Sequence, residues 1–397
     1  MHKIERLLQT LAPKGVEFRK LGEVCEILDN RRIPIAKNKR NPGIYPYYGA
    51  NGIQDYIDSY IFDGDFVLVG EDGSVINKDN TPVVNWASGK IWVNNHAHVL
   101  QTKNELKLKF LYFYLQTIDV SYCVAGTPPK INQENLKKIT IPIPPLEIQQ
   151  EIVKILDAFT ELNTELNTEL KVRKKQYEYY QNMLLDFNGI NQNHKDAKMS
   201  AKTYPKRLQT LLQTLAPKGV EFRKLGEVCD FQKGKSITKK AVTFGKVPVI
   251  SGGRQPAYYH NEANRSGETI AISSSGVYAG YVSYWDIPVF LADSFSVSPK
   301  QKTLMPKYLF HYLTTQQDVI HATKSTGGIP HVYSKDLQNF LIPIPPLEIQ
   351  QEIVKILDQF LALTTDLLAG IPAEIEARKK QYEYYREKLL AFKPLKA

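Results

Sequence analysis

The segment IPIPPLEIQQEIVKILD occupies residues 141–157 and recurs letter for letter at residues 342–358. Each copy starts with a proline-rich stretch, and a proline pair suits the start of a helix but not its interior. Apolar residues then continue at helical spacing into the sequence that follows. The segment therefore predicts two long helices, one in each half of the chain.

The sequence before each helix is also duplicated, because LLQTLAPKGVEFRKLGEVC at residues 7–25 returns at residues 211–229. A third identity follows the helix start, where RKKQYEYY at residues 173–180 returns at residues 378–385. Two long repeats do not form a solenoid, which needs at least about three shorter units. The order of the identities indicates a pseudo-twofold internal repeat.

Between the identities, the bodies at residues 26–140 and 230–341 differ in sequence. Short apolar runs, glycine-rich turns and a closing helix in both bodies predict one mixed α/β fold. We expect strands at residues 21–28, 66–69, 83–86, 91–93, 97–100 and 270–272, and helices at 107–116 and 306–314. A shared frame with different loops suggests one scaffold that carries two different readers.

Apolar residues in the long helices step alternately by four and three residues, which is the heptad pattern of a coiled coil. The seam residues are Ile152, Ile155, Phe159, Leu162 and Leu166 in the first helix and Ile353, Ile356, Phe360, Leu363 and Leu367 in the second. We expect these two helices to pair with each other; an ordinary helical hairpin core is the alternative. Residues 160–170, TELNTELNTEL, form a four-residue tandem repeat inside the first helix.

These features divide the chain into five parts. They are the opening segment with the first body at residues 1–146, the first long helix at 147–188, a linker at 189–210, the second body at 211–346 and the second long helix at 347–397.

The composition favours a polyanionic partner. The 397 residues include 51 Lys and Arg against 41 Asp and Glu, so the net charge is +10 and the pI is about 9.1. Cys25, Cys123 and Cys229 are too few and too far apart for a disulfide framework or a zinc site. Because no apolar run reaches the roughly 18 residues of a membrane span and no signal core is present, we expect a cytoplasmic protein without a membrane partner.

Basic residues cluster near the start of both bodies, and we expect them to contact phosphate groups. The clusters are Arg31, Arg32, Lys37, Lys39 and Arg40 in the first body and Lys233, Lys235, Lys239 and Lys240 in the second. A solvated surface is the alternative for any single residue.

Polar residues that differ between equivalent loops are candidates for base contact. They are Asn51, Lys130 and Asn132 in the first body and Arg254, Gln255, Ser274, Tyr278, His331 and Tyr333 in the second. Lys130 corresponds to His331, and Asn132 corresponds to Tyr333. The Arg254 side chain has the fork that pairs with guanine.

No constellation of acid, base or nucleophile recurs in both bodies. TPPK at residues 127–130 lacks the polar first residue and the stacking aromatic of an adenine-methyltransferase tetrapeptide. GKS at residues 234–236 lacks the first glycine of a phosphate-binding loop, because Cys229 stands there. His96 and His98 would share one face of a strand, but two histidines without a third ligand are usually structural. We therefore expect no catalysis, cofactor or metal in this chain.

The order of these parts resembles the DNA-specificity subunit of type I restriction-modification systems. The resemblance rests on the LGEVC, GANG and ISSSG segments, the GTPPK and GGIP loops and the repeated helix sequences, and it covers essentially the whole chain. It implies an α+β fold class, with two mixed α/β target recognition domains separated by two long antiparallel coiled-coil helices.

The same resemblance implies a non-catalytic subunit whose two domains each read one half of a gapped site in double-stranded DNA. The helices would dock two adenine methyltransferase subunits, which bind S-adenosylmethionine, and restriction-translocase subunits would join outside. The TELN repeat would set the gap between the half-sites. Two alternatives are a coiled-coil adaptor that does not bind DNA and an enzyme with duplicated catalytic domains.

Overall fold

The computed structural model describes residues 2–73, 75–187, 204–300, 302–325, 328–365 and 370–395. Most of the predicted linker and the predicted seam residue Leu367 lie outside these ranges. The chain divides into two compact units. Unit 1 contains Met1–Asn167 and Glu374–Ala397, and unit 2 contains Thr168–Ala373. No helix in the described ranges is long and apolar enough to cross a bilayer.

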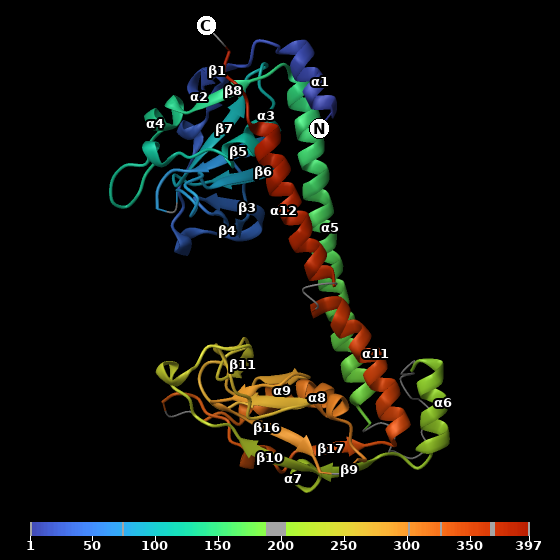
Figure 1. The fold of residues 1–397 in the computed structure, drawn as a ribbon. Coiled ribbons are helices and arrows are strands. Elements are labelled where there is room, and N and C mark those ends of the chain that lie inside the picture. Colours follow the sequence, from blue (N-terminus) through green and yellow to red (C-terminus); the bar gives the residue numbers. More distant parts are fainter. Residues whose placement is uncertain are drawn as a thin grey trace. The chain divides into compact units, whose positions relative to one another are not determined.

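Unit 1 is built on a six-stranded sheet with the order β2-β7-β5-β6-β3-β4 (Figure 1). Its strands are β2 (Cys25–Ile27), β3 (Pro42–Gly49), β4 (Gly52–Ile57), β5 (Phe62–Gly70), β6 (Val84–Val93) and β7 (Ala97–Thr102). A separate antiparallel pair joins β1 (Glu17–Lys20) to β8 (Thr140–Ile143). The shorter helices are α1 (His2–Leu11), α2 (Leu21–Val24), α3 (Leu108–Leu115) and α4 (Gln133–Lys138). Side chains of β5 and α3 share one buried apolar core.

Unit 2 repeats this plan with its strands in smaller sheets. One sheet has the order β10-β16-β13-β14, a second has β12-β11-β15, and β17 pairs with β9. The strands are β9 (Glu221–Lys224), β10 (Cys229–Lys233), β11 (Val247–Ile250), β12 (Tyr258–His260), β13 (Thr269–Ser273), β14 (Val282–Trp285), β15 (Phe290–Leu291), β16 (Ser294–Pro299) and β17 (Leu341–Ile344). The shorter helices are α6 (Lys206–Leu215), α7 (Leu225–Val228), α8 (Pro306–Thr315), α9 (Gln317–Ala322) and α10 (Ser334–Leu337). α6 begins inside the stretch at residues 189–210 that the sequence predicts to be a linker.

Most of the expected strands and helices are confirmed, including those within β5, β7, β13, α3 and α8. The strand expected at residues 21–28 is wrong in its first half, which forms α2. Leu21 and Val24 are both buried there, because their spacing fits one turn of helix. The two strands expected at 83–86 and 91–93 are one strand, β6, which continues through Gly89 at a φ of 76°.

One glutamine fastens each body to its long helix. In unit 1, Nε2 of Gln149 donates to the carbonyl oxygens of Glu105 and Pro144 at 2.9 and 2.8 Å. Its Oε1 accepts from the backbone N–H of Lys107 at 2.8 Å. Gln350 makes the equivalent three bonds in unit 2, and both glutamines are fully buried. The identical helix sequence thus holds two different bodies by the same contacts.

The long helices pair within each unit. α5 (Leu146–Leu185) is continuous and contributes residues to both units. In unit 1, Phe159 of α5 stacks on Tyr385 of α12 (Ile371–Leu390), with 5.5 Å between ring centroids. In unit 2, Tyr180 of α5 stacks on Phe360 of α11 (Leu347–Thr365) at 5.1 Å. Both contacts join the same two repeat positions, and the paired segments in each unit run antiparallel (Figure 1).

The heptad prediction fails at Leu363, which is 37% exposed, whereas the neighbouring Thr364 is 3% exposed. Ile353, Leu357 and Thr364 form the buried face of this part of α11. Leu357 and Thr364 are seven residues apart, as in a heptad, but each lies one residue after a predicted seam position. The predicted register is therefore one residue early in this part of α11, and it misplaces Leu363.

Candidate nucleic-acid interface

Three segments converge beside the end of β5 in unit 1. The backbone N–H of Glu71, which follows β5, donates to the carbonyl oxygen of His96 at 2.8 Å. The N–H of Ile131 donates to the carbonyl oxygen of Glu71 at 2.9 Å, and that of Gly73 donates to Pro129 at 3.0 Å. Gly73 has a φ of 79°, a conformation that favours glycine. The end of β5, the start of β7 and the loop before α4 therefore form one edge.

The same edge is built in unit 2 with other side chains. The N–H of Ser274 donates to the carbonyl oxygen of Asp293 at 3.0 Å, and the N–H of Val332 donates to Ser274 at 2.9 Å. The N–H of Gly276, with a φ of 85°, donates to Pro330 at 3.0 Å. We call these regions the three-segment edges: residues 71–73, 96 and 129–132 in unit 1, and residues 274–276, 293 and 330–333 in unit 2. The bonds match Glu71 with Ser274, His96 with Asp293 and Lys130 with His331.

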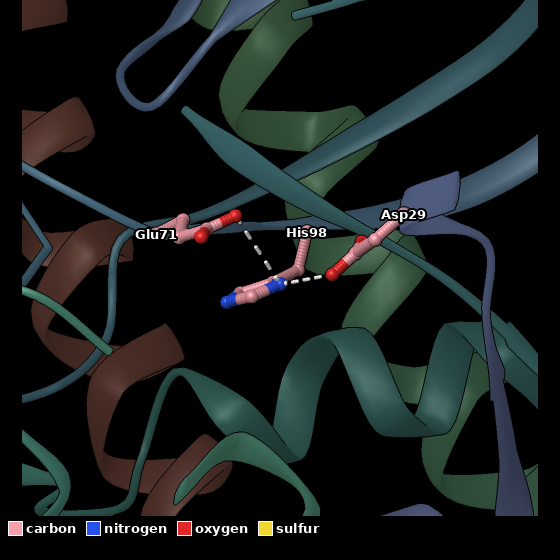
Figure 2. Close-up of side chains that lie close together, drawn as sticks. All are labelled: Asp29, Glu71 and His98. Atoms are coloured by element: carbon pink, nitrogen blue, oxygen red, sulfur yellow. Dashed lines mark hydrogen bonds and ion pairs between the residues drawn. The ribbon is translucent and has the colours of Figure 1, made fainter. Parts of the chain in front are cut away.

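A buried charge network supports the edge of unit 1 (Figure 2). His98 is fully buried, with Nδ1 2.6 Å from Oδ2 of Asp29 and 3.7 Å from Oε2 of Glu71. Its Nε2 lies 2.7 Å from the carbonyl oxygen of Ile131. Arg32 donates to Oε2 of Glu71 at 2.5 Å and lies 3.5 Å from Asp29. The network thus ties the segment that follows β2 to all three converging segments.

The charges of this network compensate one another. Burial alone would raise the pKa of the Asp29 carboxyl, but the hydrogen bond from His98 and the charges of His98 and Arg32 hold that pKa below its usual value. Glu71 also accepts an ion pair at 3.0 Å from Nζ of Lys130, which is 47% exposed. Asp29, Glu71 and His98 lie close enough together to hold a metal ion. However, both carboxylates already pair with Arg32. The geometry therefore favours an ion-pair network that holds Lys130 in place, and not a metal-binding site.

Unit 2 lacks this network at the matching positions. The register of β10 with β16 sets Lys233 opposite Phe295, where unit 1 has Asp29 and His98. A hollow of about 380 Å³ lies at the edge instead. Its lining includes Lys233, Ser274, Asp293, His331, Tyr333 and Lys335. Four predicted contact residues, from three separate stretches of sequence, therefore meet at one hollow.

Two aromatic candidates in unit 2, Tyr333 and Tyr278, lie against another candidate side chain. The ring of Tyr333, which is 45% exposed, lies parallel to that of His331, with an interplanar angle of 13° and 6.0 Å between centroids. The guanidinium of Arg254 lies 5.0 Å from the ring centroid of Tyr278. Such a contact holds a planar side chain in place while leaving its hydrogen-bond donors available.

The structure argues against phosphate contact by Arg32 and Arg40. The Arg32 side chain is 11% exposed and engaged by two carboxylates. The Arg40 side chain lies 4.1 Å from the ring centroid of Tyr47 and 3.3 Å from the Asp55 carboxylate. Both arginines stabilise the fold of unit 1 through these contacts. The prediction was wrong for them because the sequence alone does not show which cations have partners within the fold.

The remaining candidates divide into exposed and engaged side chains. Arg31, Lys37, Lys39, Asn51, Lys235, Lys239, Lys240 and Gln255 are exposed. Arg31 also lies over the ring of Phe62 at 4.8 Å. Asn132 caps α4, since its side-chain oxygen accepts from the N–H of Asn135 at 2.8 Å. Ser274 is half-buried and lines the hollow of unit 2.

Prediction from the sequence did not identify Asp29, Glu71, Asp72 and Asp293, because basic and amide side chains are the usual signs of a DNA-binding surface. One signal was available. Aligning Gly73 with Gly276 sets the acidic pair Glu71 and Asp72 against two serines. A change of charge within a shared glycine frame marks a loop whose polar groups are free to vary.

Both halves of the chain match the profile described as the type I restriction modification DNA specificity domain, at residues 13–173 and 217–377. The chain belongs to this family. It is similar to a putative type I restriction enzyme specificity subunit of Haemophilus influenzae, with 37% identity over 402 residues that cover 98% of both chains. It is also similar to the EcoR124I/EcoR124II specificity subunit of Escherichia coli, with 29% identity over 426 residues, 99% of this chain and 97% of that subunit.

The fold agrees with this membership. The crystal structure of a type I restriction-modification S subunit from M. genitalium matches with a TM-score of 0.64 and 20% sequence identity, covering 94% of this chain and 95% of that one. The chain is therefore a specificity subunit of the type I class, with two mixed α/β recognition domains and long helices. Nothing in these matches favours a coiled-coil adaptor or a duplicated enzyme.

Proposed function

We propose that each unit reads one half of a gapped, asymmetric DNA site, using its three-segment edge. The main support for this proposal is that the same backbone hydrogen bonds present different side chains in the two units. A conserved backbone with changed side chains keeps the position of each contact and alters which base it accepts. Exposed lysines of the two basic clusters, among them Lys37, Lys39, Lys239 and Lys240, contact phosphate groups and supply affinity that does not depend on sequence.

The paired helices set the distance between the two half-sites. In support of this role, the boundary between the compact units, at Asn167 and Thr168, falls inside the TELN repeat of α5. A change in repeat number therefore changes the length of helix that links the units and leaves the sequence of both bodies unchanged.

The subunit itself is non-catalytic, and two adenine methyltransferase subunits dock on the repeated helix sequences. Two copies of one docking sequence suit two copies of one partner, as the internal repeat provides. S-adenosylmethionine binds the partner, and restriction-translocase subunits join the assembly outside. The relatives named as type I restriction enzyme specificity subunits support such an assembly.

Methyl-transfer assays with and without the partner test this function. The pure chain, incubated with labelled S-adenosylmethionine and genomic DNA, should transfer no methyl groups. The complex with its methyltransferase subunits should methylate adenine within one bipartite, asymmetric motif. Methyl transfer by the chain alone would favour the duplicated enzyme, and an active complex without a bipartite motif would contradict the assignment of one half-site to each unit.

A further inference from the structure

In each three-segment edge, two side chains form a hydrogen bond, and one of the two is a carboxylate. The carboxylate stands at a different one of the two positions in each unit. In unit 1, Asp72 follows Glu71, and one of its oxygens pairs with Nδ1 of His96. In unit 2, Ser275 stands where Asp72 stands, and Asp293 stands where His96 stands. The Ser275 hydroxyl donates to Oδ2 of Asp293. The carboxylate therefore comes from the segment after β5 in unit 1 and from the segment before β16 in unit 2. In both units the edge keeps one carboxylate that is held by a hydrogen bond.

A carboxylate is costly on a surface that meets DNA, because it repels phosphate groups. Nearby cations offset that repulsion in both units: Lys130 pairs with Glu71 beside Asp72, and Lys233 and Lys335 line the same hollow as Asp293. Retention of an acid at this place in two divergent bodies therefore calls for a donor on the DNA. Phosphate and sugar ring oxygens supply none.

The major groove offers two kinds of hydrogen-bond donor, the N4 amino group of cytosine and the N6 amino group of adenine. An ionised carboxylate accepts at about four positions on two oxygens. The partner residue occupies one oxygen and orients the group, so acceptor capacity remains. His96 and Asp72 are 47% and 27% exposed in their side chains, and Asp293 is exposed.

We propose that Asp72 in unit 1 and Asp293 in unit 2 each enter the major groove and accept a hydrogen bond from the amino group of a base there, and so require cytosine or adenine at one position of each half-site. His96 and Ser275 act as positioning residues for these carboxylates. This assignment rests on the proposed function, because it concerns the bases that the two units read.

Variants Asp72→Asn and Asp293→Asn, assembled with the methyltransferase subunits, separate base reading from a purely structural pairing. Asparagine keeps the shape but replaces one acceptor oxygen by a donor. Methylation-sensitive sequencing should show each variant relaxed at one position of one half-site, with roughly tenfold lower discrimination there, in the range expected for one base contact. The two variants should affect opposite half-sites.

Two carboxylates outside the three-segment edges serve as matched controls. Asp65 in β5 accepts from the Ser88 hydroxyl, and Glu268, just before β13, accepts from the Tyr284 hydroxyl. Asp65→Asn and Glu268→Gln should leave the motif unchanged. If Asp72→Asn fails to assemble, Asp293→Asn carries the test, because the Asp293 carboxylate is exposed and is held by the hydroxyl of Ser275.

Synthetic duplexes identify the donor. Removing the amino group at the affected base, with purine for adenine or 2-pyrimidinone for cytosine, should weaken binding of the parent complex roughly tenfold and leave the matching variant unaffected. Unchanged motifs in active variant complexes, or an affected base pair at which neither cytosine N4 nor adenine N6 is the group contacted, would overturn the proposal. If the parent complex yields no bipartite motif, the proposed function fails instead.

Discussion

Nδ1 of His98 lies 2.6 Å from Oδ2 of Asp29, and His98 has no exposed surface. Asp29 also pairs with the Arg32 guanidinium at 3.5 Å, and removing one partner of a buried charge pair leaves the other without compensation, at a cost of about 3–5 kcal/mol. The Asp29 side chain is 8% exposed, so solvent screens the pair little. This contact therefore makes Asp29 a determinant of the stability of unit 1.

Asp29→Asn should lower the free energy of unfolding of unit 1 by about 2–4 kcal/mol at neutral pH. The pKa of Asp29 is depressed in the folded protein, so its stabilisation is present above the unfolded value of about 3.9 and is lost as the pH falls through the folded value. The difference between parent and variant should shrink below about pH 4.

Urea unfolding measures this effect. In a Trp285→Phe background, the remaining tryptophans, Trp86 and Trp92, both report on unit 1. Glu26→Gln, an exposed carboxylate on β2, is the control and should leave stability unchanged. Equal stability of Asp29→Asn and its parent at pH 7 would show that the pair has no net effect.

Lys37 and Lys39 should contribute to the salt dependence of DNA binding, whereas Arg32 should not. Each lost phosphate contact reduces the slope of log affinity against log salt by about 0.9. Replacing both lysines with Ala should weaken binding to all sequences alike. Arg32→Ala should mainly destabilise unit 1, since its side chain is 11% exposed. Fluorescence anisotropy over a range of NaCl concentrations tests this prediction. An unchanged slope for the double variant would show that the two lysines are solvated surface residues that do not contact phosphate.

The cysteines should be unreactive in the folded protein. Burial raises the pKa of Cys25 and Cys229 to about 12, and burial also raises the pKa of Cys123. Because the thiolate is the reactive form, a thiol reagent at pH 8 should label none of the three quickly. All three should react once the chain is unfolded in guanidinium. Fast labelling of Cys25 or Cys229 in the native state would contradict the burial of the two repeated LGEVC segments.

Deleting residues 163–166, one TELN unit, should shorten the gap between the half-sites. The deletion removes about 6 Å of helix and about 400° of winding, so the remaining helix keeps its phase to within about 40°. Because DNA rises about 3.4 Å per base pair, the gap should lose one or two base pairs. Motif mapping for this deletion, and for a variant with one added unit, tests the prediction. The same gap in both active complexes would show that α5 does not set the spacing.

The frame could be predicted from sequence because its signals are local. Proline pairs precede α5 and α11, and apolar runs mark β5 and β13. The charge network could not be predicted, since Asp29 and His98 are 69 positions apart and meet only through strand pairing. For the same reason, the sequence does not distinguish Arg32 from its exposed neighbours, because its partner Glu71 is 39 positions away. The match of Lys130 with His331 was predictable from shared glycines and prolines.

The exchange of one body tests the central claim most directly, namely that each body reads its own half-site from a common frame. Replacing residues 230–341 by residues 26–140 would give both units the first body between unchanged frame sequences. In complex with the methyltransferase subunits, this variant should methylate a motif that contains two copies of the half-site read by unit 1. The original asymmetric motif, or loss of the half-site read by unit 1 in an assembled and active complex, would contradict the account.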